Sequence, residues 1–117
     1  MPKQDIRVSP GSKTKRSQTG VPVARALDVI GSKWTCLILR ELLPHGERRF
    51  QDLQDSLDGI PPATLSERLS TLEQHGVVER RFYSMSPPRA ECVLTAKGRD
   101  LGPIVAAMRA WGRKHPG

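Results

Sequence analysis

Residues 48–83 read RRFQDLQDSLDGIPPATLSERLSTLEQHGVVERRFY, and this stretch decides the fold. Two leucines four residues apart predict a short helix over residues 51–57. The DGIP sequence that follows favours a tight turn, after which Pro62 suits the first turn of a second helix. We expect this second helix to cover residues 62–74, with Gly76 as its C-terminal stop.

The second helix carries one narrow apolar stripe, Leu65, Leu69 and Leu72, and the rest of its surface is polar. Such a helix can enter the major groove of DNA, because its outward side chains offer donors and acceptors to base edges. The candidate groove contacts are Ala63, Thr64, Ser66, Glu67, Arg68, Ser70 and Thr71. Arg68 flanks the leucine stripe, so a phosphate contact or an internal ion pair suits it as well as a guanine contact.

A basic hairpin follows the helix pair. Residues 77–83 and 90–94 have the β-branched and aromatic content of two antiparallel strands, joined by a tip that contains Pro-Pro-Arg. The arginines of this hairpin can contact phosphates or a minor groove of DNA, and the alternative is that they only form a solvated face of the strands. Further basic residues precede the helix pair, so the candidate backbone contacts are Lys33, Arg48, Arg49, Arg80, Arg81 and Arg89. A helix, a turn, a second helix and a hairpin follow the order of a winged helix-turn-helix.

Two more helices are predicted upstream. Residues 22–30 place apolar side chains at helical spacing, and residues 32–43 form a helix with so little polar surface that it belongs in the core. We expect Pro44 and Gly46 to end the second of these. Residues 47–50 then suit a brief strand before the helix pair.

The chain ends in a further amphipathic helix over residues 95–114. Thr95 suits its N-cap, and Gly102 with Pro103 should kink it. Both this helix and the one at residues 22–30 carry more apolar surface than a monomer of this size need expose. Pairing of two copies about a twofold axis buries such patches.

Charge and length limit the partners. The 117 residues allow one ordinary domain and a tail, and 19 Lys and Arg against 12 Asp and Glu leave a formal charge of +7. Residues 1–20 hold five of the bases and one acid, which predicts a flexible basic arm before a domain at residues 21–117. A polyanion such as nucleic acid is the expected partner.

Other classes lack their signatures. No apolar run approaches the roughly 20 residues that cross a bilayer, and no signal sequence is evident, so we expect a cytoplasmic protein without membrane contact. His45, His75 and His115 are isolated, and the motifs of metalloproteases, phosphate-binding loops and serine hydrolases are missing. We therefore expect no enzyme activity, no metal and no cofactor.

Three segments, PVARALDVIGSKWTCLILREL, the stretch at residues 48–83 and PPRAECVLTAKGRDLGPIVAAMRAWG, resemble the HxlR-type family of bacterial winged helix-turn-helix transcriptional regulators. The resemblance implies a mainly α fold with a small β-hairpin and additional dimerisation helices at both ends. It also implies a homodimer that places each 62–74 helix in a major groove of a (pseudo)palindromic operator. The dimer interface would then include Val23, Leu27, Ile104, Met108 and Trp111.

The cysteines depart from the family pattern. Some relatives sense oxidants through a cysteine just before the PVARAL-like segment, and this chain has Val21 there. Cys92 stands where an aromatic residue is common, and Cys36 at a usually aliphatic position. Both are candidate redox-sensing thiols, and small buried hydrophobes are the alternative. They do not form a CxxC pair.

These features predict a sequence-specific regulator of transcription that binds double-stranded DNA as a homodimer, with a small-molecule effector of unidentified chemistry as a candidate partner. The alternative is a winged-helix module for protein interaction or RNA association, without base-specific reading of DNA. The two differ in whether the polar face of residues 63–71 discriminates base sequence.

Overall fold

The computed structural model describes residues 20–117, so the arm expected at residues 1–20 lies outside the described part except for its last residue. The chain divides into two compact units, Met1–Gly31 and Ser32–Gly117, and each is described by itself. Within the described residues, each helix is too short or too polar to span a lipid bilayer.

The first unit contributes helix α2 (Pro22–Ile30), with the bounds expected from the sequence. Its proline occupies the first turn, where the missing N–H costs no hydrogen bond. The helix ends at Gly31, whose N–H donates to the carbonyl of Leu27 at 2.8 Å. Val23 and Leu27 are 69% and 56% exposed, so α2 presents apolar side chains on its surface.

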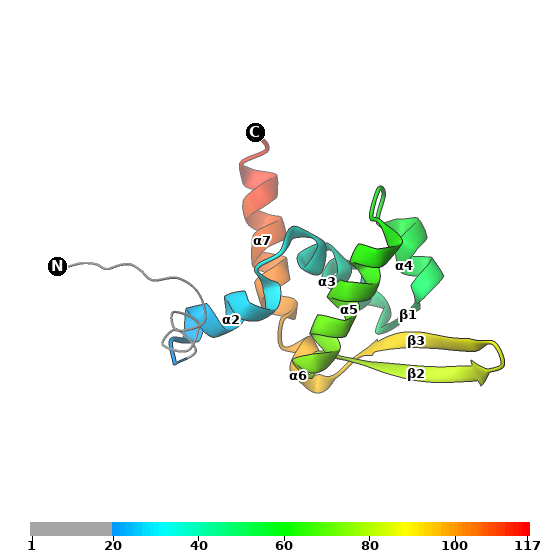
Figure 1. The fold of residues 1–117 in the computed structure, drawn as a ribbon. Helices are drawn as coiled ribbons and strands as arrows, with labels where there is room; N and C mark the ends of the chain where they lie inside the picture. Colours follow the sequence, from blue (N-terminus) through cyan, green and yellow to red (C-terminus); the bar gives the residue numbers. More distant parts are fainter. Residues whose placement is uncertain (1–19) are drawn as a thin grey trace. The chain divides into compact units, whose positions relative to one another are not determined.

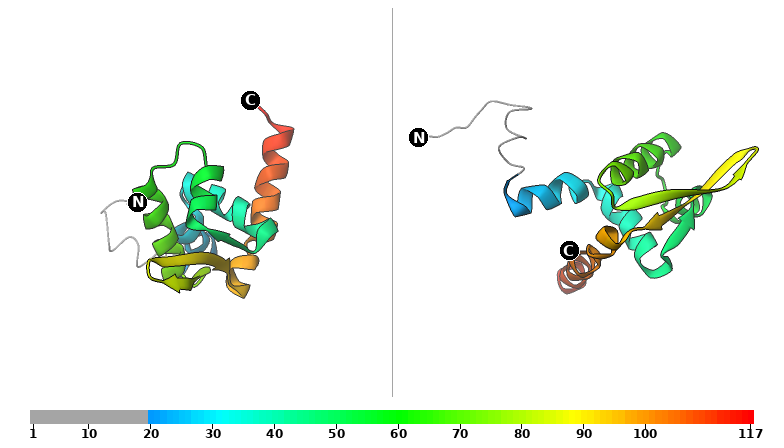
Figure 2. Two further views of the ribbon diagram at one scale, coloured as in Figure 1. Left: turned by 90° about the vertical axis from the view of Figure 1, so that its right-hand side faces the viewer. Right: turned by 90° about the horizontal axis from the view of Figure 1, so that it is seen from below.

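The second unit is mainly helical with a small antiparallel sheet, as Figures 1 and 2 show. Its elements in order are α3 (Lys33–His45), β1 (Glu47–Arg49), α4 (Phe50–Ser56), α5 (Pro62–Gln74), β2 (Val78–Met85), β3 (Pro88–Leu94), α6 (Ala96–Arg99) and α7 (Gly102–Lys114). The expected fold class is confirmed.

Phe50 begins α4 rather than ending the preceding strand, so β1 and α4 each end one residue earlier than expected. Three further differences have a structural cause. Pro44 lies inside α3, which ends at Gly46 with φ of 79°, because a proline in the last turn removes a single helical hydrogen bond. The hairpin strands reach Met85 and Pro88 and leave a two-residue turn. The C-terminal helix is broken into α6 and α7 rather than kinked, because Pro103 has no N–H to continue the ladder.

The core forms where α3 meets the helix pair and the sheet. Leu65, Leu69 and Leu72 of α5 are at most 2% exposed, and α3 packs on α5 with Ile38 and Leu42 fully buried. Full burial of one such side chain stabilises the fold by about 1.5–3 kcal/mol. Packing of the leucine stripe therefore fixes which face of α5 is buried and which is outward.

The sheet has the strand order β1-β3-β2, and both pairings are antiparallel. Side chains directly opposite one another in neighbouring strands share a face, and successive residues alternate faces. The register therefore places two rows of side chains across the three strands. One row shares the face of the sheet on which Cys92 is buried, and the other row lies on the opposite face. The inner row is Arg48, Cys92 and Arg80, and the outer row is Arg49, Glu91 and Arg81.

Helix α6 fastens the end of α5 to the end of the hairpin. The hydroxyl of Thr95 accepts from the N–H of Gly98 at 3.0 Å, which confirms its predicted role as an N-cap, and donates to the carbonyl of Gly76 at 2.6 Å. Lys97 Nζ donates to the carbonyl of His75, the C-cap of α5, at 2.7 Å.

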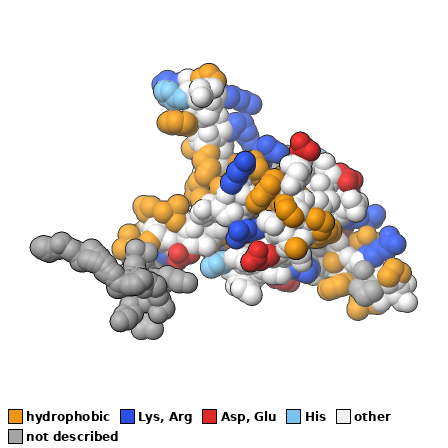
Figure 3. Space-filling model, turned by 45° about the horizontal axis from the view of Figure 1, so that its top comes forward, with side chains coloured by type: hydrophobic (Ala, Val, Ile, Leu, Met, Phe, Trp, Pro, Cys, Tyr) orange, Lys and Arg blue, Asp and Glu red, His pale blue; other side chains and the backbone are white. Residues whose placement is uncertain are grey.

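Helix α7 packs on α3 through one side and leaves another side uncovered. Val105 is 6% exposed, whereas Ile104, Met108 and Trp111 are 38%, 43% and 66% exposed. Spacings of four and three residues place these three side chains on one helical face. Figure 3 shows hydrophobic side chains gathered along the column that α7 forms.

The inner-row arginine of β1 connects three elements. Arg48 is 17% exposed and pairs with Glu41 of α3 at 3.4 Å from Nη1 to Oε1. Its Nη2 donates to Ser56 Oγ at 2.9 Å and to the carbonyl of Asp52 at 3.3 Å, both in α4. This one guanidinium therefore joins α3, β1 and α4.

We expect Arg48→Ala to lower the free energy of unfolding by about 1.5–3 kcal/mol, because it removes charge-assisted hydrogen bonds and leaves the half-buried Glu41 carboxylate without this cation. Urea titration at one protein concentration measures the change. Arg49→Ala is the matched control, since the neighbouring side chain is exposed, and we expect a loss below about 1 kcal/mol. Equal losses in the two variants would contradict the assignment.

Candidate nucleic-acid interface

The turn between α4 and α5 sets the position of the second helix. Gly59 adopts φ of 84°, a backbone conformation that glycine tolerates and most residues do not. Gln54 Nε2 donates to the carbonyl of Ile60 at 2.6 Å, and the Ile60 N–H donates to the Leu57 carbonyl at 3.1 Å. Helix α5 then begins at Pro62 and ends at Gln74, as the sequence predicts.

The side chains on the polar face of α5 differ in their exposure to solvent. Ala63, Ser66 and Glu67 are exposed, and the half-buried members are Thr64, Arg68, Ser70 and Thr71. The Thr71 hydroxyl donates to the carbonyl of Glu67 at 3.1 Å, so its donor is used within the helix. The Nε of Arg68 is buried and has no hydrogen-bond partner among the described residues.

Arg80, the inner-row arginine of β2, contacts α5 instead of solvent. Its Nη2 donates to Ser70 Oγ at 2.8 Å. Its Nε lies 3.3 Å from Glu73 Oε1, an ion pair in which the N–H is not aimed at the oxygen and finds no other acceptor in the described part of the chain. Arg80 is 30% exposed, and Glu73 is 45% exposed.

The outer-row arginines are more accessible. Arg81 is 61% exposed, and its Nε lies 3.8 Å from the carboxylate of Glu79, which is 60% exposed. Such an exposed pair contributes little to stability, so it does not hold Arg81 in place. Arg49 is exposed, and its guanidinium carbon lies 4.6 Å from the centre of the Tyr83 ring. That stacking places the cation of Arg49 beside the outer part of the hairpin.

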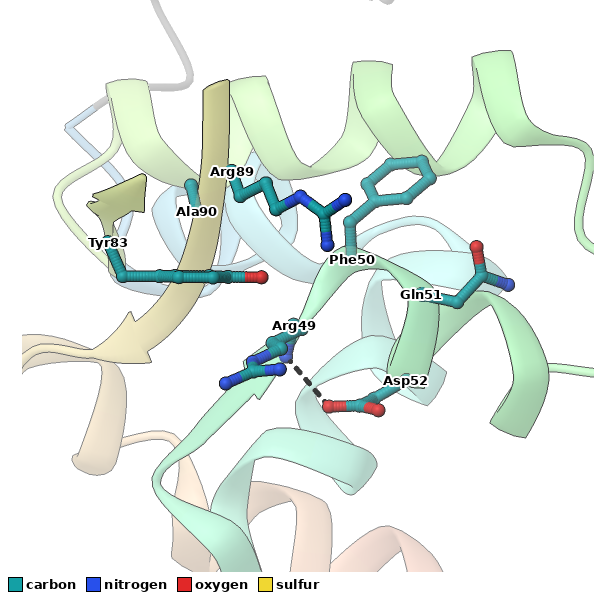
Figure 4. A pocket seen from close by; sticks show the side chains of 7 residues that line it. All are labelled: Arg49, Phe50, Gln51, Asp52, Tyr83, Arg89 and Ala90. Atoms are coloured by element: carbon teal, nitrogen blue, oxygen red, sulfur yellow. Dashed lines mark hydrogen bonds between the residues drawn. The ribbon is translucent and has the colours of Figure 1, made fainter. Parts of the chain in front are cut away.

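A hollow of about 610 Å³ opens between the start of α4 and the hairpin. Figure 4 shows Arg89 reaching from β3 toward Phe50, and Arg49 below the ring of Tyr83. The Asp52 carboxylate also lies here, but it accepts from the backbone N–H of Arg49 at 3.1 Å and so serves the start of α4. The hollow is lined by Arg49, Phe50, Gln51, Asp52, Tyr83, Arg89 and Ala90.

The six predicted backbone contacts therefore fall into different surroundings. Arg49 and Arg89 are brought together at one hollow, and Arg81 is exposed on the outer row. Arg48 and Arg80 are committed to contacts within the protein. Lys33 is exposed at the first residue of α3, with its Nζ 5.8 Å from the centre of the Trp34 ring.

Sequence reasoning did not single out Phe50 and Tyr83 as part of this site. Tyr83 lies at an irregularity in the pairing of β2 with β3, between Phe82 and Ser84. A bulge of this kind re-aims side chains and leaves no reliable mark in the sequence. The proximity of Arg49 and Tyr83 depends on pairing between strands far apart in the chain, which one sequence does not reveal.

The two cysteines differ in their surroundings, and Cys92 lines a small pocket beside Phe50 and Ser66. Cys92 is 3% exposed in the inner row of the sheet, and Cys36 is half-buried in α3. Burial raises the pKa of both thiols; for Cys92, the nearby charges of Arg80 and Glu73 act in opposite directions. A raised pKa disfavours the thiolate, which is the form that reacts with oxidants. Among the described residues no cluster of His, Cys, Asp or Glu suits a metal ion.

Known transcriptional regulators resemble this chain in sequence. Residues 29–116 match the HxlR-like helix-turn-helix family. The HTH-type transcriptional regulator sll1512 of Synechocystis sp. is 43% identical over 91 residues, which cover 78% of this chain and 67% of that protein. YdeP, an HTH-type transcriptional regulator of Bacillus subtilis, is 38% identical over 96 residues, 82% of this chain and 74% of its own.

A solved structure agrees with the fold. The redox regulator HypR in its reduced form superposes with a TM-score of 0.75 at 37% identity, over 81% of this chain and 93% of that chain. The family match spans both the helix pair and the hairpin. The chain therefore belongs to the HxlR-like helix-turn-helix family, and it is a transcriptional regulator of the winged helix-turn-helix type, not an enzyme.

Proposed function

We propose that this regulator reads a specific sequence of double-stranded DNA as a homodimer on a (pseudo)palindromic operator. The observation that carries the proposal is the setting of α5. Its leucine stripe is buried, its polar face is outward, and the adjoining hairpin presents Arg81 and Arg89. Because its DNA would be chromosomal, the protein would act in the cytoplasm.

Base reading falls to the accessible face of α5. The Glu67 carboxylate can accept from the amino group of cytosine, and Ser66 can donate or accept. The methyl group of Ala63 suits apolar contact with thymine. Thr64 and Arg68 are half-buried beside them, so they are placed for contacts at the groove edge.

The accessible arginines would bind the phosphate backbone of DNA. Arg49 and Arg89 flank one hollow, where the guanidinium of Arg49 stacks on Tyr83 and Arg89 extends toward Phe50. Arg81 is exposed on the outer row of the sheet. Guanidinium groups bind phosphate oxygens and release counterions from DNA, which raises affinity without selecting a sequence.

The dimer would form through the terminal helices. The uncovered face of α7 holds Ile104, Met108 and Trp111, and α2 holds the exposed Val23 and Leu27. Exposed apolar side chains gathered on one face of a helix mark protein interfaces, and a second copy supplies a matching surface by symmetry. Each copy would then place one α5 helix on its own half of the operator.

The direct test is selection of bound duplexes from a random DNA pool at about 150 mM salt, where purely electrostatic binding is weak. We expect recovery of an inverted repeat with half-sites about one helical turn, or a multiple of it, apart. Recovery without any shared motif would refute sequence-specific reading. It would favour a winged-helix module that binds RNA or protein.

We expect Arg89→Ala to weaken binding to all duplexes and to flatten the salt dependence. The plot of log affinity against log salt should lose about one unit of slope for each lost phosphate contact, in each protomer. Fluorescence anisotropy over a salt series measures the slope. Relative affinities for the operator and a scrambled duplex should stay unchanged, and an unaltered slope would remove Arg89 from the interface.

We expect Met108→Glu to separate the dimer, because pairing would bring two carboxylates into an apolar contact. Sedimentation velocity at micromolar concentrations should show folded monomers with reduced operator affinity. Ala106→Glu is the control, since this exposed residue lies on the opposite side of α7. Dimers of Met108→Glu as stable as wild type would contradict the proposed interface.

A further inference from the structure

We propose that Arg80 is a positioning residue that fixes the recognition helix α5 against the hairpin and thereby sets sequence discrimination, without itself binding a phosphate. The inference rests on the proposed function. It assigns opposite roles to two adjacent arginines in the same strand, Arg80 and Arg81.

The contacts of Arg80 lead into the protein. From β2 it donates to the Ser70 hydroxyl at 2.8 Å and pairs with the Glu73 carboxylate at 3.3 Å, and both acceptors lie on α5. The opposite residue in β3 is Cys92, which is buried, so this row of the sheet faces the protein interior. Arg80 is half as exposed as Arg81, at 30% against 61%.

The charge of Arg80 is already compensated. Its guanidinium has the Glu73 carboxylate beside it, and release of counterions from DNA needs a cation that is free to replace them. Arg81 has an exposed and more distant carboxylate, 3.8 Å away, which water and salt screen. The two residues carry equal formal charge but offer different amounts of it to DNA.

The position of the Arg80 contacts on α5 explains why Arg80 affects the discrimination between DNA sequences. The leucines attach α5 along one narrow stripe, which by itself allows the helix to roll about that line. Ser70 and Glu73 lie in the second half of the helix, beside the stripe, so Arg80 adds a second line of attachment. Hydrogen bonds to base edges need side chains held within a fraction of an ångström, so a helix that rolls discriminates less well between base sequences.

The test compares Arg80→Gln with Arg81→Gln in the full chain, on the operator found by selection and on a scrambled duplex. We expect Arg80→Gln to lower the ratio of the two affinities about tenfold, the loss that one charge-assisted hydrogen bond gives, with the salt slope unchanged. We expect Arg81→Gln to flatten the slope by about one unit per protomer and to keep the ratio. The reverse pattern would overturn the proposal.

Two further variants separate positioning from phosphate binding. Arg80→Lys keeps the charge but lacks the planar fork that reaches two acceptors, so we expect the same loss of discrimination as Arg80→Gln. Glu73→Gln should also lower discrimination, and the double variant Arg80→Gln with Glu73→Gln should be no worse than either single one. If Arg80 instead bound phosphate, Arg80→Lys would retain binding and Glu73→Gln would strengthen it.

Amide hydrogen exchange gives a readout without DNA. Loss of the Arg80 contacts should speed exchange in the second half of α5, residues 68–74, while the denaturation midpoint of Arg80→Gln shows that the protein stays folded. Unchanged exchange in α5 would overturn the positioning role even if the wild type selects an operator. Failure of the wild type to select any duplex would refute the proposed function and with it the effect of Arg80 on discrimination, while the exchange result would still decide whether Arg80 holds α5 against the hairpin.

Discussion

Burial of the leucine stripe of α5 is the constraint on which the rest depends. Three leucines at most 2% exposed fix α5 on α3, and each contributes about 1.5–3 kcal/mol of transfer free energy to a small core. A stripe this narrow leaves most of the helix circumference outward. The same packing that stabilises the fold therefore displays its polar side chains, so stability and the proposed DNA recognition would use opposite sides of one helix.

The sheet adds a second constraint through its register. Each of the two Arg-Arg pairs in the chain, at residues 48–49 and 80–81, is split by the alternation of strand side chains. The first arginine of each pair faces helices, and the second faces away. Two of the five arginines in these strands therefore hold the scaffold together, and the other three are available to a polyanion. The formal charge of +7 overstates what DNA would meet on this surface.

Sequence periodicity predicted α5 from Pro62 to Gln74, the Thr95 cap and the winged arrangement, because these depend on local spacing of leucines, prolines and caps. It did not separate Arg48 and Arg80 from their neighbours. Strand alternation says that adjacent arginines point to opposite faces, but the choice of face depends on pairing with β3, a contact between distant segments. Tyr83 was missed for the same reason. Pro44 was wrongly expected to end its helix, because a proline in the last turn removes a single helical hydrogen bond and the turn can still form.

The short helix α6 has a mechanical consequence for a dimer. Through Thr95 and Lys97 it is bonded to Gly76 and His75 at the end of α5, and two residues later the chain enters α7. No flexible linker separates the reading helix from the helix proposed to join the copies. Two copies joined through α7 would therefore hold their α5 helices at a set separation, and an extra base pair between half-sites would have to be absorbed by twisting the DNA.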